Sequence, residues 1–351
     1  MTLAVRVPLL VAGMLSLVAG IAAGLARLGF DLAAPAALHG PLVGGAFLGT
    51  VIGLERAVAL GRWWAYGAPL AAALAGLAWI LRLPPQLGGA LLAAGGLVLV
   101  AAAVAIWRKQ RETHNLVLGA GAVCLAVGGG VCAAGHISET APAWLGFLVL
   151  TIAGERLELS RFMPPSPAAK QWFAGICAVL FLAVLLAIPV PQYGWKAVAA
   201  SLLALAAWLA MQDIARRTIR EQGLTRYIAA ALLLGYLWLA VGAVIAAAAP
   251  DFAPGRPAWD AALHAWFLGF VFSMIFGHAP IIAPALLRVN LRYSAWFYLP
   301  LAVLHLSLAE RIAGDFLLDH ATRARGAAAN AVAIVLFIAT MLYAGLSKRR
   351  P

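Results

Sequence analysis

AALHAWFLGFVFSMIFGHAPIIAPALLR, residues 261–288, is an apolar run whose only ionisable side chains before its basic end are His264 and His278. Its length is typical of a helix that crosses a membrane. At about 100° per residue, His278 returns to within about 40° of His264, so the two imidazoles share one face of the predicted helix. Ionisable side chains are rare inside membrane spans and usually have a function there. The stretch therefore predicts a membrane helix with a functional face.

The rest of the chain has the same apolar character. Of the 351 residues, 64% are hydrophobic and 11% are charged, whereas a soluble domain is about half apolar and about a quarter charged. The composition predicts an all-α, polytopic membrane protein in contact with the lipid bilayer. Its net charge of +12 fits basic cytoplasmic loops and does not indicate nucleic acid as a partner. Cys124, Cys132 and Cys177 lie in apolar runs without a CxxC spacing, so we expect core residues and not a disulfide or zinc framework.

Apolar runs of about 20 residues predict the membrane spans. The first run, after Arg6, lacks a polar cleavage region and is interpreted as a span and not as a removed signal. About twelve spans are expected, at residues 7–28, 35–57, 63–83, 86–107, 115–136, 141–160, 170–190, 195–215, 226–249, 258–287, 293–314 and 326–346. With a cytoplasmic N-terminus, sixteen loop Lys and Arg residues lie on the cytoplasmic side and six on the other. This bias predicts that both termini are cytoplasmic.

A short motif recurs in the second and tenth predicted spans. Each contains Ala-Ala-Leu-His, ending at His39 and His264, with Gly44 and Gly269 five residues after the histidine. Both spans enter the membrane from the same side, so the two histidines are expected at similar depth. A second short repeat consists of residues 53–56 (GLER) and residues 154–156 (GER), which lie four spans later. We therefore expect one membrane domain over residues 1–351, in which the repeats suggest three four-helix units.

His39 and His264 are the first candidate site. Neutral imidazole is the usual axial ligand of haem iron, and the two axial ligands come from opposite faces of the porphyrin. Nearby glycines leave space for close helix approach or for a macrocycle. Two histidines on separate spans therefore favour binding of haem or another metal. The alternative is that both side chains cap polar helix ends near the membrane interface.

His278 and His305 are the second candidate site. His278 precedes Pro280 and Pro284, which are expected to kink the tenth span, and His305 lies midway along the eleventh. A buried pair of neutral histidines can hold a second metal or relay protons. Ordinary hydrogen bonds between helices are the alternative.

Three acidic–basic doublets form the third set: Glu55-Arg56, Glu155-Arg156 and Glu310-Arg311. A carboxylate in the hydrocarbon region is costly unless it is paired. Adjacent residues point in different directions on a helix, so each Glu is expected to meet an Arg from another span. The doublets predict either a proton path through Glu55, Glu155 and Glu310 or salt bridges that fasten the spans. His114, His136 and His320 lie at span ends or in loops, and no role is assigned to them.

The histidine segments resemble those of the NnrS family, membrane proteins that contain haem and copper and are linked to bacterial nitric oxide stress. The likeness rests on His39 with Gly44, on His264 with Gly269 and Gly277, and on residues 308–311 (LAER) of the eleventh span. At a coarser level, the number of spans resembles haem-copper oxidase subunit I. The three copper-ligating histidines of that subunit have no counterpart in the sixth and seventh spans. After the tenth span, residues 287–290 (LRVN) replace the family's basic stretch, which leaves a second metal position without its motif.

The NnrS resemblance implies a protein of the bacterial inner membrane that binds haem b, with copper as a second metal, and that handles nitric oxide or another small gaseous or redox ligand. His39 and His264 are the implied axial ligands. A proton-coupled secondary transporter that uses the Glu/Arg pairs is the alternative function. A scaffold or assembly factor for a respiratory complex is a third interpretation.

Overall fold

The computed structural model describes residues 3–160, 163–287 and 289–346. Most of these residues lie in helices, and none of them forms a β-strand. The chain packs as two compact units. The first comprises Met1–Phe162 and Ala174–Ala197, and the second comprises Met163–Phe173 and Val198–Pro351. Two long helices, α7 (Pro167–Ala187) and α8 (Pro191–Gln212), contribute residues to both units. The expected division into three four-helix units stays a prediction.

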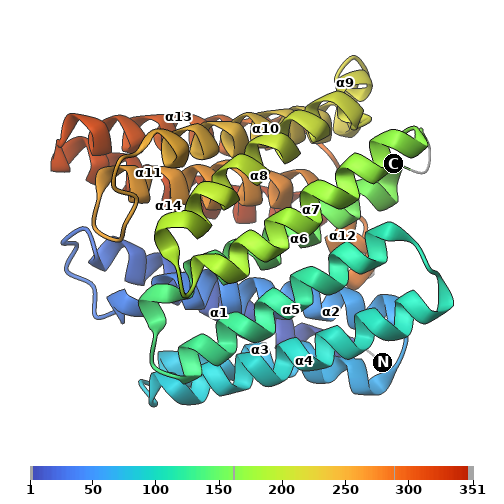
Figure 1. Ribbon diagram of the computed structural model, residues 1–351, viewed down its shortest axis with the longest axis horizontal. Helices are drawn as coiled ribbons and strands as arrows, with labels where there is room; N and C mark the ends of the chain where they lie inside the picture. The colour runs from blue at the N-terminus through green and yellow to red at the C-terminus, as the bar shows by residue number, and fades with distance from the viewer. Residues whose placement is uncertain (1–2, 161–162, 288, 347–351) are drawn as a thin grey trace. The chain divides into compact units, whose positions relative to one another are not determined.

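Six long helices build most of the first unit (Figure 1). Gly61 ends α2 in the left-handed region (φ +69°), a conformation that glycine adopts without strain. Pro84 and Pro85 begin α4 after the tight turn that follows α3. The elements are α1 (Leu3–Ala26), η1 (Ala36–Leu38), η2 (Pro41–Phe47), α2 (Leu48–Leu60), η3 (Trp63–Tyr66), α3 (Gly67–Ile80), α4 (Pro85–Lys109), α5 (Thr113–Ala133), η4 (Ile137–Glu139) and α6 (Ala141–Leu159).

The second unit is built around α10, α12, α13 and α14. Within it, α13 and α14 run side by side (Figure 1). Its remaining elements are α9 (Ala215–Thr218), α10 (Gly223–Ala248), α11 (Pro257–His264), η6 (Ala265–Phe272), α12 (Ser273–Leu287), η7 (Ala295–Phe297), α13 (Tyr298–Leu317) and α14 (His320–Leu346).

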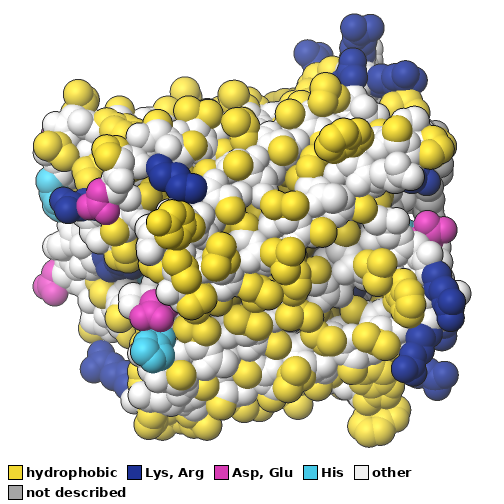
Figure 2. Space-filling model, viewed as in Figure 1, with side chains coloured by type: hydrophobic (Ala, Val, Ile, Leu, Met, Phe, Trp, Pro, Cys, Tyr) yellow, Lys and Arg dark blue, Asp and Glu magenta, His cyan; other side chains and the backbone are white. Residues whose placement is uncertain are grey.

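Eleven helices among the described residues are long and apolar enough to cross a membrane. Hydrophobic side chains cover most of the face shown in Figure 2, as expected for contact with lipid. The prediction of an all-helical, multi-pass membrane protein is therefore confirmed. The expected span at residues 293–314 corresponds to α13, which is not among the eleven, because every 18-residue stretch of it contains Glu310, Arg311 and Asp315.

Small residues let neighbouring helices approach closely. A Cβ atom on Gly96 of α4 would lie 2.5 Å from the backbone nitrogen of Ala126 in α5. Likewise, a Cβ atom on Gly326 of α14 would lie 2.6 Å from the backbone nitrogen of Arg311 in α13. In a membrane, such close packing replaces the hydrophobic driving force that joins helices in water. The Gly- and Ala-rich composition is thus used at the helix contacts inside each unit.

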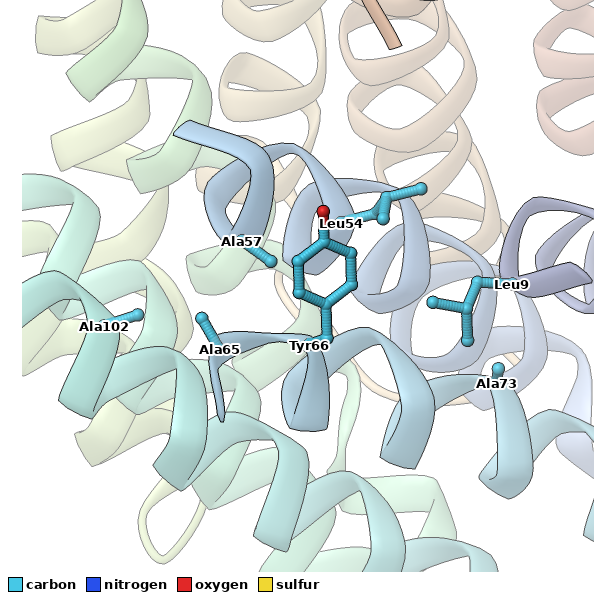
Figure 3. Close-up of a cluster of buried hydrophobic side chains, with 7 residues drawn as sticks. All are labelled: Leu9, Leu54, Ala57, Ala65, Tyr66, Ala73 and Ala102. Carbon is cyan, nitrogen blue, oxygen red and sulfur yellow. The ribbon is translucent and has the colours of Figure 1, made fainter. Parts of the chain in front are cut away.

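A buried cluster in the first unit shows how these helices join (Figure 3). Tyr66 packs among short side chains from several helices. Its members are Leu9, Leu54, Ala57, Ala65, Tyr66, Ala73 and Ala102. The three cysteines are also buried and carry free thiols, which confirms their interpretation as core residues.

The tenth span keeps its helical assignment across the two prolines that were expected to kink it. α12 continues through both Pro280 and Pro284, and the expected kink stays a prediction. The irregular segments are the π-helices η2 and η6, one in each unit.

Candidate functional site

Each of the two Ala-Ala-Leu-His motifs runs directly into a π-helix. His39 is followed by Gly40 and then by η2, and His264 is followed at once by η6. Both π-helices occupy a membrane-spanning helix, within Pro41–Leu60 in one unit and Pro257–Leu287 in the other. Segments of π-helix are rare and frequently lie at functional sites. The internal repeat predicted from the sequence thus coincides with a shared irregularity of the backbone.

His39 is held by the preceding helix of its own unit. Its Nδ1 lies 2.7 Å from the carbonyl oxygen of Gly20 in α1. A carbonyl oxygen can only accept a hydrogen bond, so Nδ1 carries a hydrogen, and in the neutral ring Nε2 carries the lone pair. Gly24, one turn further along α1, leaves room for the ring, because a Cβ atom there would lie 2.7 Å from Nδ1. The half-buried imidazole is therefore fixed in a single tautomer and orientation.

The tautomer of His264 is fixed in the same way. Its Nδ1 lies 2.7 Å from the backbone carbonyl oxygen of Asp260, one turn earlier on α11, and 3.4 Å from the Oδ2 atom of the same residue. Nε2 is again the nitrogen with the lone pair. A carboxylate beside Nδ1–H raises the basicity of the ring as a metal ligand.

Asp260 belongs to a buried cluster of charges in the second unit. Arg311 donates to Asp260 at 3.0 Å, and Arg323 lies 3.2 Å from its other oxygen. Arg323 also pairs at 2.8 Å with Asp315, whose side chain is only 1% exposed. The two carboxylates and two guanidinium groups balance one another, as burial of charge requires. Sequence reasoning missed this cluster, although Asp260 lies one helical turn before His264.

His278 and His305 have different hydrogen-bond patterns. Nδ1 of His278 donates to the carbonyl oxygen of Met274 at 2.8 Å, so its tautomer matches that of His39 and His264. His305 instead accepts from the indole N–H of Trp238 at 2.8 Å, and its Nε2 lies 3.4 Å from Ser273 Oγ. Both nitrogens of His305 therefore have protein partners, the arrangement expected of a histidine that joins helices.

Two of the acidic residues expected to form a proton path, Glu155 and Glu310, form ion pairs between helices. Arg56 of α2 donates to Glu155 of α6 at 2.6 Å, and both side chains are largely buried. Glu55 lies within electrostatic range of this pair. Glu310 pairs with Arg325 of α14 at 3.2 Å on an exposed surface. For Glu155 and Glu310, the partner comes from another helix, as the sequence predicted.

A family comparison covers nearly the whole chain. Residues 6–346 match a family model described as a domain of unknown function, DUF8744. The chain belongs to the DUF8744 family. No curated protein matches the sequence. All the histidines and charged pairs described above lie within the region that the DUF8744 model covers.

The donor atoms indicate which kind of cofactor this DUF8744 chain can hold. Within the described ranges, no group of three or more His, Cys, Asp or Glu side chains is arranged to hold a metal ion. Haem iron requires only one or two imidazole nitrogens, because the porphyrin supplies the other four ligands. His39 and His264, each with a defined Nε2 lone pair, fit that requirement.

Proposed function

We propose that this protein is a haem b-binding membrane protein, with His39 in the first unit and His264 in the second each a candidate axial ligand through Nε2. The observation that carries the proposal is the Nδ1–H bond from each ring to a backbone carbonyl oxygen, at 2.7 Å in both cases. Such a bond on the second nitrogen selects the tautomer that ligates through Nε2 and orients the ring.

The residues around each ring have separate tasks in this proposal. Gly20 and Gly24 of α1 hold His39 by a carbonyl acceptor and by the space for its ring. Asp260 orients His264, and Arg311 and Arg323 neutralise the Asp260 carboxylate. Haem b, when bound, supplies an iron that binds a diatomic gas or exchanges one electron. The resemblance to the NnrS family makes nitric oxide the proposed ligand and the bacterial inner membrane the proposed location, with a role in binding, protection or reduction.

Absorption spectra of detergent-purified variants test the two ligands. His39→Ala and His264→Ala should each lower the haem content or shift the Soret band. His136→Ala is the matched control, because this histidine is 60% exposed and pairs only locally with Glu139; its spectrum should equal that of the unmodified protein. Unchanged spectra in both ligand variants, with folded protein, would remove His39 and His264 from the haem site.

A second candidate function is proton-coupled transport. It is favoured by the π-helices η2 and η6, which interrupt one membrane-spanning helix in each unit, since transporters place discontinuous helices in both halves around the substrate. In this case the buried Arg56–Glu155 pair and Glu55 would carry protons. Proton uptake into proteoliposomes should then fall in Glu55→Gln and Glu155→Gln but not in Glu310→Gln, whose side chain is more exposed. No uptake above that of empty liposomes would rule out this function.

A further inference from the structure

The exposed side of α4 has the length of the hydrocarbon core of a membrane. Exposed residues recur every three or four positions on one face of this helix: Leu87, Ala90, Ala94, Leu97, Ala101, Val104 and Arg108. Apolar side chains form this stripe from Leu87 to Val104, and Arg108 ends it. At about 1.5 Å per residue, Arg108 lies about 32 Å from Leu87 along the helix axis, and the hydrocarbon core is about 30 Å thick. With the stripe in the core, Arg108 lies at the level of the lipid headgroups.

Further basic side chains lie at the same end of α4. Lys109 and Arg111 follow Arg108 closely, and all three are exposed. Figure 2 shows Lys and Arg side chains gathered at its right-hand edge, where α4 passes into α5. Arg111 lies over the ring of Trp107, with 5.4 Å between its Cζ atom and the ring centroid, which is a cation–π contact. Glu112 is the one acidic residue of this connection, so the connection has a net positive charge.

The segment that leads into α3 adds a fourth cation to this end. A Cβ atom on Gly67 would lie 3.6 Å from Val98 of α4. Ala65 belongs to the same buried cluster as Ala102, one turn further along α4 (Figure 3). Steps backward from Gly67 therefore correspond to steps forward along α4. Arg62, three residues before Ala65 and exposed, is thus placed toward the last turns of α4.

We call Arg62, Arg108, Lys109 and Arg111 the basic end of the first unit. Trp63 follows Arg62, and its side chain is 78% exposed. Trp side chains are enriched at the boundary between membrane and water, where the ring contacts apolar groups and the indole N–H contacts polar ones. The exposed indole therefore supports, independently of the length of α4, a position of the basic end among lipid headgroups.

The cations of the basic end differ in pairing from exposed cations of the second unit. In that unit, Arg256 pairs with Asp251 at 2.7 Å, and Arg325 pairs with Glu310 at 3.2 Å. Among the residues that the structure describes, no member of the basic end forms an ion pair. Their charges are therefore available to an anion from outside the protein.

We propose that the basic end and the apolar stripe beside it bind an anionic glycerophospholipid of the bilayer. The acyl chains lie along Leu97 and Val104, which are 64% and 42% exposed, and the negatively charged headgroup contacts the basic end. Clusters of Lys and Arg at the membrane surface attract anionic lipids. A soluble anion would gain nothing from the apolar stripe, whereas a phospholipid matches both parts of the surface. This surface is independent of haem binding, because it includes no histidine.

Photo-crosslinking of the full-length protein in phosphatidylcholine vesicles tests this surface. The probe is phosphatidylglycerol with a diazirine in its acyl chain, and phosphatidylcholine with the same diazirine measures contact with lipid in general. Mass spectrometry quantifies the labelled peptides of α4. In the unmodified protein, the phosphatidylglycerol probe should label residues 97–104 several-fold more than the phosphatidylcholine probe. Equal labelling by the two probes would overturn the proposal.

Two charge-matched variants make the test specific. Arg108→Gln/Lys109→Gln removes two cations of the basic end and should bring the labelling ratio of the two probes close to one. Arg256→Gln/Arg325→Gln is the matched control, because it removes the same charge from exposed arginines that have acidic partners; this variant should keep the ratio. An unchanged ratio in Arg108→Gln/Lys109→Gln, or an equal loss in both variants, would overturn the proposal.

Competition with a soluble anion distinguishes a lipid surface from a phosphate site. Inorganic phosphate, compared with sodium chloride at the same ionic strength, should lower the labelling only as much as chloride does, since both screen the charges. A selective loss of labelling in inorganic phosphate would assign the cations to a soluble anion and overturn the proposal.

Discussion

Three histidines make the same kind of hydrogen bond, in which the ring Nδ1 donates to a backbone carbonyl oxygen. It is present at His39, His264 and His278 at 2.7–2.8 Å, whereas His305 accepts at Nδ1 from Trp238. The sequence analysis paired His39 with His264 by their expected depth and took His278 with His305 as a second candidate site. A tautomer depends on partners such as Gly20, nineteen residues before His39, and a motif does not contain that information.

Gly24→Ala should displace the His39 ring. The added methyl group would lie 2.7 Å from Nδ1 and 2.8 Å from Cε1, so we expect a destabilisation of about 1–3 kcal/mol and a weaker His39–Gly20 bond. Thermal unfolding in detergent measures the effect. Gly130→Ala in α5 is the control, because a Cβ atom there meets nothing within 4 Å. An equal melting temperature in the two variants would contradict the predicted contact.

The Arg56–Glu155 pair should show the behaviour of a buried ion pair. Arg56→Leu leaves the Glu155 carboxylate buried and unpaired, at an expected cost of about 3–5 kcal/mol. The double variant Arg56→Leu/Glu155→Leu should recover part of that loss, since no lone charge remains. Arg325→Leu should cost only about 0–1 kcal/mol, because Arg325 is 66% exposed. Thermal unfolding of the unmodified protein and of the three variants should give this order of stability. A double variant no more stable than Arg56→Leu would contradict it.

At the scale of elements, the apolar runs predicted where helices lie but not their hydrogen-bond pattern. The expected span at residues 115–136 corresponds to α5 (Thr113–Ala133), and the one at residues 141–160 corresponds to α6 (Ala141–Leu159). The π-helices η2 and η6 were not predicted, because a hydrophobic run allows both α- and π-helical bonding. The Asp260 cluster was missed for a related reason: its partner Arg311 lies 51 residues later, on α13.

Deletion of Leu268 should convert η6 to α-helix. A π-helical turn bonds residue i to i+5, one residue more than an α-helical turn, so removal of one residue should keep the faces of α12 in register. We expect folded protein with an altered His264 environment. Deletion of Ile275 in α12 is the control, because it rotates all later residues by about 100°. Size-exclusion profiles compare the two, and aggregation of only the Leu268 variant would contradict the prediction.

At the scale of the whole molecule, composition alone identified a multi-pass, all-helical membrane protein. The count of spans depends on α13, in which Glu310, Arg311 and Asp315 fall within every 18-residue stretch. The two compact units were not predicted, because they depend on packing between helices that are distant in sequence.

Orientation in the membrane follows from the distribution of loop charges. Sixteen Lys and Arg residues are assigned to the cytoplasmic side and six to the other, so the C-terminus should be cytoplasmic. A C-terminal fusion to green fluorescent protein should fluoresce, and a fusion to alkaline phosphatase should be inactive. The reverse pattern would require an odd number of crossings or the opposite orientation.

The central claim is that this protein binds haem b. The most direct measurement is a reduced-minus-oxidised absorption spectrum of protein expressed with ample haem and purified in detergent, with the haem quantified as pyridine haemochrome. We expect a b-type α-band and a near-stoichiometric ratio of haem to protein. A featureless spectrum from folded protein would contradict it and would leave the histidines as residues that pack helices together.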